Sequence, residues 1–160
     1  GGGPAGQVGR RRSDNAPLFP AGYAGTITHT PRFAIAAVAP GAAGIGVDLE
    51  PRRFDPALHR FLFTDEEREQ LWPDRELESL RGLYAAKEAG FKALSGGDCR
   101  AAHGGLYFRV RLERDGGGRL WARAGEARAL VHCAGTPTFG FAVAVRTTDR
   151  PAATRHPRPS

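Results

Sequence analysis

Two short segments carry charged residues whose types and spacing suit chemistry on a phosphate group. Asp48 and Glu50 are two positions apart in a segment with strand character, so their carboxylates share one face. Glu88 and Lys92 are four positions apart in a helical segment and also share a face. Carboxylate oxygens suit Mg²⁺, which takes few protein ligands together with waters and phosphate oxygens. The pattern therefore predicts a magnesium site at Asp48, Glu50 and Glu88, with Lys92 one turn away to stabilise a phosphate oxygen.

The chain contains lysine only at positions 87 and 92, while arginine is used throughout the rest of the sequence. Because an ammonium is a compact, strongly hydrated point charge, its retention against this background indicates a specific requirement. The alternative is an exposed Glu88–Lys92 pair worth only ~0.2–0.5 kcal/mol. His29 is a candidate second phosphate donor, and its alternative is a structural hydrogen bond.

Strands are needed to position the first two carboxylates. We expect one strand over residues 26–39, buried on both faces because it is almost wholly apolar, and a second strand over Gly44–Glu50. A turn at Pro40–Ala43 would join them into a hairpin, with Asp48 opposite Ile35. This arrangement would bring His29 to the end of the hairpin that carries the carboxylates.

A helix is needed to position Glu88 and the lysines. Apolar residues at steps of three, four and seven predict a helix over Leu77–Leu94, and Gly96 follows as a stop. A shorter helix begins near Thr64, where Glu67 completes a capping box, and Pro73 separates the two helices. The acids of this helix start are explained by capping and are not assigned to catalysis.

Beyond Gly97 the apolar period changes from helical to two. We expect strands over Leu106–Leu112, Arg119–Arg123 and Phe139–Val145, with a hairpin turn at Asp115–Gly118. Strand-rich regions on both sides of a helical middle predict an α+β fold.

The expected organisation is a connector over residues 1–25, a folded domain over 26–149 and a disordered tail over 150–160. No apolar run approaches the ~20 residues of a membrane span, so we expect a cytoplasmic protein with reduced cysteines. The net charge of +6 favours anionic partners. The basic residues are scattered and base-stacking aromatic residues are absent, which argues against a nucleic-acid module.

Five motifs resemble those of the 4'-phosphopantetheinyl transferases, in order and spacing. They are Leu18-Phe-Pro-Ala-Gly22, Ile27-Thr-His29, Gly46-Val-Asp-Leu-Glu50, Phe63-Thr-Asp-Glu-Glu67 and Tyr84-Ala-Ala-Lys-Glu-Ala-Gly-Phe-Lys92. The likeness is greatest to the branch that serves siderophore and other nonribosomal peptide or polyketide synthases. Tyr84 stands where this family has tryptophan, which keeps an aromatic side chain.

The resemblance implies Mg²⁺-dependent transfer of the 4'-phosphopantetheine arm of coenzyme A to a serine of an apo acyl or peptidyl carrier protein, releasing adenosine 3',5'-bisphosphate. Asp48, Glu50 and Glu88 match the family's metal-site acids, and His29, Lys87 and Lys92 match its contacts to coenzyme A phosphates. Glu88 also matches the proposed general base, with Lys92 assisting, although a metal-bound water is an alternative base.

Family members of this type have two similar lobes, with the active site between them. The chain contains no methionine, so we expect that it is a fragment that begins near the end of the first lobe. We expect the full-length protein to be a monomer, and this chain alone to bind coenzyme A weakly and turn over slowly. The competing hypothesis is a noncatalytic basic lobe that binds a carrier protein or a nucleotide.

Overall fold

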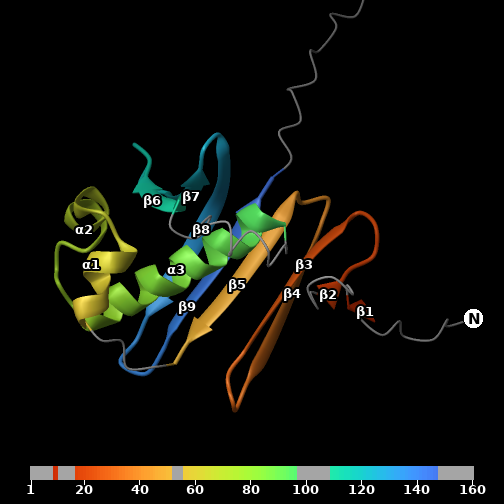
Figure 1. Cartoon of the computed structure of the whole chain (residues 1–160), viewed down its shortest axis with the longest axis horizontal. Helices are drawn as coiled ribbons and strands as arrows, with labels where there is room; N and C mark the ends of the chain where they lie inside the picture. The colour runs from red at the N-terminus through yellow and green to blue at the C-terminus, as the bar shows by residue number, and fades with distance from the viewer. Residues whose placement is uncertain (1–8, 11–16, 52–55, 97–108, 148–160) are drawn as a thin grey trace, which may run out of the picture.

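The computed structural model describes residues 9–10, 17–51, 56–96 and 109–147 (Figure 1). Its helical elements are a 3₁₀ turn, Pro56–Leu58, followed by α1 (His59–Leu62), α2 (Asp65–Leu71) and α3 (Leu77–Ser95). Its strands are β1 (Gly9–Arg10), β2 (Pro17–Leu18), β3 (Tyr23–His29), β4 (Ala34–Pro40), β5 (Gly44–Glu50), β6 (Arg111–Arg114), β7 (Leu120–Ala124), β8 (Ala127–Gly135) and β9 (Gly140–Arg146). The predicted α+β class is confirmed.

An antiparallel sheet with the strand order β5-β9-β8-β7-β6 forms the centre of the fold. The helix α3 lies across one face of this sheet and contacts each of its strands (Figure 1). The hairpin β3–β4 is a separate two-stranded sheet that lies beside β5. The main core is therefore the layer between α3 and the five-stranded sheet.

Small residues let α3 lie directly on β5. A Cβ added at Gly46 would be 1.9 Å from the carbonyl oxygen of Ala89, and one added at Gly44 would be 2.1 Å from that of Ala93. On the helix side, Ala89 and Ala93 are fully buried. The helix ends at Gly96, whose φ of 61° is the left-handed conformation that favours glycine. The predicted helix and its stop are confirmed.

The start of α2 confirms the predicted capping box. The hydroxyl of Thr64 accepts a hydrogen bond from the amide of Glu67 at 3.2 Å, and the Glu67 carboxylate accepts one from the Thr64 amide at 2.8 Å. Acidic side chains in the first turn also complement the helix dipole. This capping helps to hold α2 in place beside α3.

The prediction of one strand over residues 26–39 is wrong, because the chain turns back inside it. The amide of Thr30 donates to the carbonyl of Phe33 at 2.7 Å, and the Thr30 hydroxyl accepts from the Phe33 amide at 3.0 Å. Pro31 lies in this turn and separates β3 from β4. The alternating exposure of β4 also contradicts burial on both faces.

The predicted pairing of the carboxylate strand is wrong as well. Asp48 lies opposite Ala142 of β9 rather than opposite Ile35, since β5 pairs with β9 and not with β4. The segment Pro40–Ala43 does not close a hairpin: the amide of Gly41 donates to the carbonyl of Gly22, and that of Ala43 to Arg146. This segment connects the two-stranded β3–β4 sheet to the five-stranded sheet, and one hydrogen bond attaches it to each.

The remaining strands agree with the prediction in part. The turn after Asp115 is confirmed by a 2.9 Å hydrogen bond from the Gly118 amide, and β7 and β9 lie within one residue of their expected bounds. The strand β8 was not predicted. Residues 97–108 and 148–160 lie outside the described part, which leaves β6 as the described end of the strand expected over 106–112. The strand β3 begins at Tyr23, inside the segment expected to be a connector.

No helix in the described ranges is both long enough and apolar enough to span a membrane.

Candidate active site

A pocket of about 450 Å³ lies where the ends of β3 and β5 meet α3. It is lined by Thr28, His29, Thr30, Pro31, Asp48, Leu49, Glu50, Pro51, Tyr84 and Glu88. The structure therefore brings together His29 and all three carboxylates that the sequence singled out, from three separate segments. These side chains line one pocket even though the hairpin expected between residues 26 and 50 does not form.

The alternation of β5 explains why the carboxylates face the helix. Side chains two apart share a face, so Asp48 and Glu50 follow Gly44 and Gly46 on the face that meets α3. Gly44 and Gly46 permit the close approach of α3. Asp48 and Glu50 follow them on the same face and line the pocket. The segment Gly44–Glu50 thus combines a helix-packing surface with a polar site.

Lys92 reaches this site from the next turn of α3. Its ammonium donates to a carboxylate oxygen of Asp48 at 2.6 Å and to the carbonyl of Val47 at 3.1 Å. The same Asp48 oxygen accepts a 3.4 Å hydrogen bond from the buried hydroxyl of Thr28. The Lys92 side chain keeps 28% of its surface exposed and that of Asp48 keeps 11%, so the pair lies at the border between protein and solvent.

The carboxyl group of Glu88 lies in an environment that disfavours its charged form. Burial raises the pKa of its carboxyl group, and the negative charges of Asp48 and, more weakly, Glu50 raise it further. The ammonium of Lys92 and a hydrogen bond from Tyr84 act in the opposite direction. A carboxylate whose pKa is raised in this way is a stronger proton acceptor than an ordinary glutamate.

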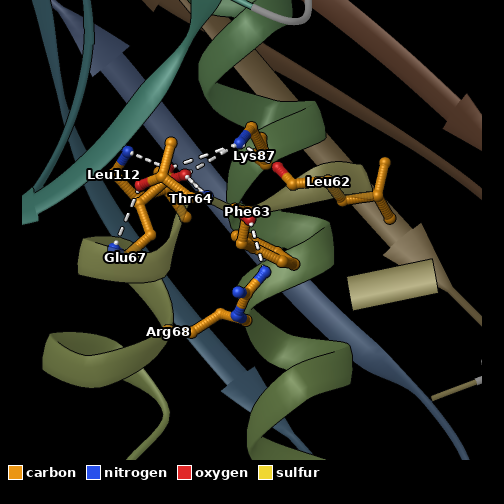
Figure 2. Close-up of polar contacts among 7 residues, drawn as sticks. All are labelled: Leu62, Phe63, Thr64, Glu67, Arg68, Lys87 and Leu112. Atoms are coloured by element: carbon orange, nitrogen blue, oxygen red, sulfur yellow. Dashed lines mark hydrogen bonds and ion pairs between the residues drawn. The ribbon is translucent and has the colours of Figure 1, made fainter. Parts of the chain in front are cut away.

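The structure does not bring Lys87 to the pocket. Its side chain is 1% exposed, and its ammonium donates to both oxygens of Glu67 at 3.3 Å and to the carbonyl of Leu62 (Figure 2). The ring of Phe63 lies 4.8 Å from the same ammonium. Lys87 therefore faces α1 and α2, whereas the adjacent Glu88 faces the pocket.

The three carboxylates of the predicted magnesium site share a pocket but are not arranged as a metal site. Within the described residues, no group of three or more histidine, cysteine or acidic side chains is arranged so that it could hold a metal ion. Asp48, Glu50 and Glu88 line one pocket, but Asp48 is bonded to Lys92. The chemistry of the donors still suits Mg²⁺, because carboxylate oxygens are its preferred protein ligands and a hard cation would offset the negative charge that Asp48 and Glu50 place near Glu88.

Sequence reasoning missed two polar groups of the site. Thr28 was not assigned a role, and Tyr84 was treated only as a replacement for tryptophan, although it hydrogen-bonds Glu88. The signal for Thr28 was present in the alternation of β3, where Thr26 and Thr28 are both buried polar residues on one face. The wrong strand assignment concealed it.

Comparison with known proteins identifies the family to which this α+β chain belongs. The family model of the 4'-phosphopantetheinyl transferase superfamily matches residues 44–144. The chain belongs to this superfamily. The match spans β5 and α3, and with them Asp48, Glu88 and Lys92.

Two solved structures share the fold. A holo-[acyl-carrier-protein] synthase of Thermotoga maritima is 23% identical, with a TM-score of 0.52 over 67% of this chain and 64% of that chain. A holo-(acyl-carrier-protein) synthase of Bacillus anthracis, in complex with CoA (3',5'-ADP), is 24% identical, with a TM-score of 0.50 over 67% of this chain and 98% of that chain. Both are acyl-carrier-protein synthases rather than enzymes of the siderophore branch. The chain thus spans 64% of the length of the Thermotoga protein. A search of curated proteins gave no match.

Proposed function

We propose that this protein transfers the 4'-phosphopantetheine arm of coenzyme A to a serine of an apo carrier protein. The observation that carries the proposal is the convergence of Asp48, Glu50 and Glu88 on one pocket beside Lys92, in a chain of this superfamily. A diphosphate substrate needs both kinds of charge, because an ammonium binds its oxygens directly and carboxylates bind the metal ion that accompanies it.

In the proposed reaction, the serine hydroxyl oxygen attacks the phosphorus that carries the pantetheine arm. The bond from that phosphorus to the bridging oxygen breaks, and adenosine 3',5'-bisphosphate leaves with the bond electrons. Glu88 accepts the serine proton, consistent with the raised pKa of its carboxyl group. If Asp48 exchanged its bond to Lys92 for a metal ion, Asp48, Glu50 and Glu88 would hold Mg²⁺, which when bound neutralises negative charge on the diphosphate.

Lys92 and His29 are the proposed phosphate contacts of the described residues. Lys92 lies at the solvent border of the pocket, and an arriving phosphate oxygen would compete with Asp48 for its ammonium. His29 is exposed at the end of β3 and lines the same pocket. Contacts of this kind hold the reacting phosphate in line with the serine, which can supply much of the rate enhancement.

The substrate branch is a narrower proposal. The segments Leu18–Gly22 and Ile27–His29 resemble the siderophore and nonribosomal peptide branch, and they favour a peptidyl carrier protein as acceptor. The two solved structures that share the fold are acyl-carrier-protein synthases, so an acyl carrier protein is the matched comparison substrate.

The test is the mass of an apo carrier protein after incubation with this chain, coenzyme A and Mg²⁺, using one peptidyl and one acyl carrier protein. We expect a mass increase of one phosphopantetheine group on the wild-type reaction and none with Asp48→Ala or Glu88→Ala. Glu69→Ala, which removes an exposed acid of α2, is the matched control and should transfer like the wild type. Full activity of both site variants would contradict the site. Binding of coenzyme A without transfer to either acceptor would favour the noncatalytic lobe.

A further inference from the structure

The buried cluster around Lys87 is unusual because it is charged, nearly closed to solvent and one residue from the proposed base. Lys87 is 1% exposed and Glu67 is 4% exposed. Taking two charges out of water costs several kcal/mol per ion unless hydrogen bonds satisfy both partners. The contacts of each group show whether this condition is met.

Glu67 is satisfied on both carboxylate oxygens. One oxygen accepts from the backbone amide of Leu112 at 2.7 Å, and the other accepts from the Thr64 amide at 2.8 Å (Figure 2). Both oxygens also lie 3.3 Å from the Lys87 ammonium. Glu67 therefore ties together the start of α2, the beginning of β6 and the middle of α3.

Lys87 is satisfied in the same way. Its three ammonium hydrogens have the carbonyl of Leu62 and the two oxygens of Glu67 as acceptors, and the face of the buried Phe63 ring lies beside them. Arg68 fixes the carbonyl of Phe63 from the other side at 3.0 Å. No donor of Lys87 remains for a coenzyme A phosphate, and its side chain is enclosed by protein.

We propose that Lys87 is a positioning residue that, with Glu67, fixes the turn of α3 that presents Glu88 to the pocket. Lys87 and Glu88 are consecutive, so a shift of the helix that moves Lys87 relative to Glu67 must also move the Glu88 backbone. The pair acts on transfer through Glu88 and does not touch coenzyme A. This inference rests on the proposed function and replaces the phosphate contact that the motif resemblance implied for Lys87.

The test is a double-mutant cycle on transfer kinetics with Lys87→Met, Glu67→Gln and the double variant. Lys87→Met leaves a buried carboxylate without its partner, so we expect kcat to fall by about tenfold or more while KM for coenzyme A stays within about threefold. The double variant removes the unpaired charge and should recover most of the lost kcat. Arg123→Gln, which breaks an exposed pair with Glu113, is the control and should change neither parameter.

A direct role of Lys87 on coenzyme A predicts the opposite pattern. In that case Lys87→Met would raise KM for coenzyme A, and the double variant would be no better than Lys87→Met; either result would overturn the proposal. If Lys87→Met does not fold, Glu67→Gln and the double variant still decide it, since a lower kcat in the single variant than in the double supports positioning and equal kcat values contradict it.

A second readout separates this proposal from a failure of the proposed function. The side-chain carboxyl carbon resonance of Glu88, assigned by its loss in Glu88→Gln, can be followed at one pH in the absence of substrate. We expect it to shift in Lys87→Met and to return toward the wild-type position in the double variant, whether or not the wild type transfers. An unchanged resonance in Lys87→Met would contradict positioning.

Discussion

The two lysines of α3 form ion pairs of opposite character within five residues. Lys87 is enclosed, and its three donors are met by Glu67 and a backbone carbonyl. Lys92 bonds Asp48 with 28% of its side chain still exposed, and the described residues supply it with only two acceptors. In the Lys87–Glu67 pair (the buried pair), every ammonium donor has an acceptor and both side chains are buried. In the Lys92–Asp48 pair (the open pair), the ammonium is partly exposed and can accept a further ligand.

Helix geometry explains why the same segment builds both pairs. At 3.6 residues per turn, positions five apart point about 140° away from each other. Lys87 therefore projects toward α1 and α2, and Lys92 projects toward β5 and the pocket. A motif that places two lysines in one helix does not give them one role, because burial and the number of fixed acceptors decide what each can bind.

Removing the charge of Lys87 should have the largest effect on stability. Lys87→Met leaves the Glu67 carboxylate buried without a counter-charge, and we expect a loss of about 3–5 kcal/mol in the free energy of unfolding. Lys92→Met leaves an Asp48 carboxylate that still accepts from Thr28, and should cost less than Lys87→Met, about 1–2 kcal/mol. Urea unfolding of both variants measures the difference, and equal losses would remove the distinction between the pairs.

Gly46→Ala should disturb the open pair by forcing α3 away from β5. Its Cβ would lie 1.9 Å from the carbonyl oxygen of Ala89, so α3 must move away from β5 and carry Lys92 from Asp48. We expect a stability loss of about 1–3 kcal/mol and loss of transfer activity. Gly116→Ala is the control, because an added Cβ there has no atom within 4 Å. Unfolding and transfer values of Gly46→Ala equal to the wild type would show that the close packing is not required.

Replacement of Lys92 should act mainly on activity. We expect Lys92→Ala to lose about tenfold or more in kcat/KM for coenzyme A. Lys92→Arg should lose less but should not reach the wild type, because a planar guanidinium does not replace a point charge on one phosphate oxygen. Steady-state transfer assays decide this, and a purely structural Lys92 would show a small stability change with unchanged rates.

The smallest expected effect is the pH dependence contributed by Glu88. The pKa of its carboxyl group is raised above the ordinary 4.5, first by burial and then by Asp48. The folded state therefore retains the proton more strongly, and the stability from this group is present below pH 4.5 and is lost as pH rises through the folded pKa. Glu88→Gln should thus become more stable relative to the wild type between pH 4 and pH 7. The unfolding free energy of Glu88→Gln minus that of the wild type should therefore rise with pH, and a fall in this difference would contradict the prediction.

Local patterns were sufficient to predict α2 and α3 and to single out side chains that line one pocket, but not the pairing of strands. The capping box of Thr64 and the glycine stop at Gly96 depend on neighbouring residues, and both were correct. The partner of β5 is β9, almost 100 residues away. Nothing in the sequence of either strand identifies the other as its partner, so the prediction paired β5 with the apolar segment next to it in the chain. Pro31 is a sequence signal for the turn that separates β3 from β4, but the prediction of one continuous strand did not use it.

The surroundings of the two lysines also could be predicted only where they depend on nearby residues. Spacing alone placed Lys92 on the face of Glu88 and next to the carboxylates, which the structure confirms. The burial of Lys87 depends on Leu62, Glu67 and Leu112, which are up to 25 positions distant. A motif gives residue types and spacing, but only the packed fold determines which of them remain accessible to a substrate.

The most direct test of the distinction between the lysines is the affinity for coenzyme A, measured by titration calorimetry at two salt concentrations. At a temperature where all three proteins are folded, we expect Lys92→Met to bind about tenfold more weakly than the wild type and with less dependence on salt. Lys87→Met should bind within about threefold of the wild type and keep its salt dependence. Weakened binding by Lys87→Met together with unchanged binding by Lys92→Met would contradict the assignment of the open pair to the substrate and the buried pair to the fold.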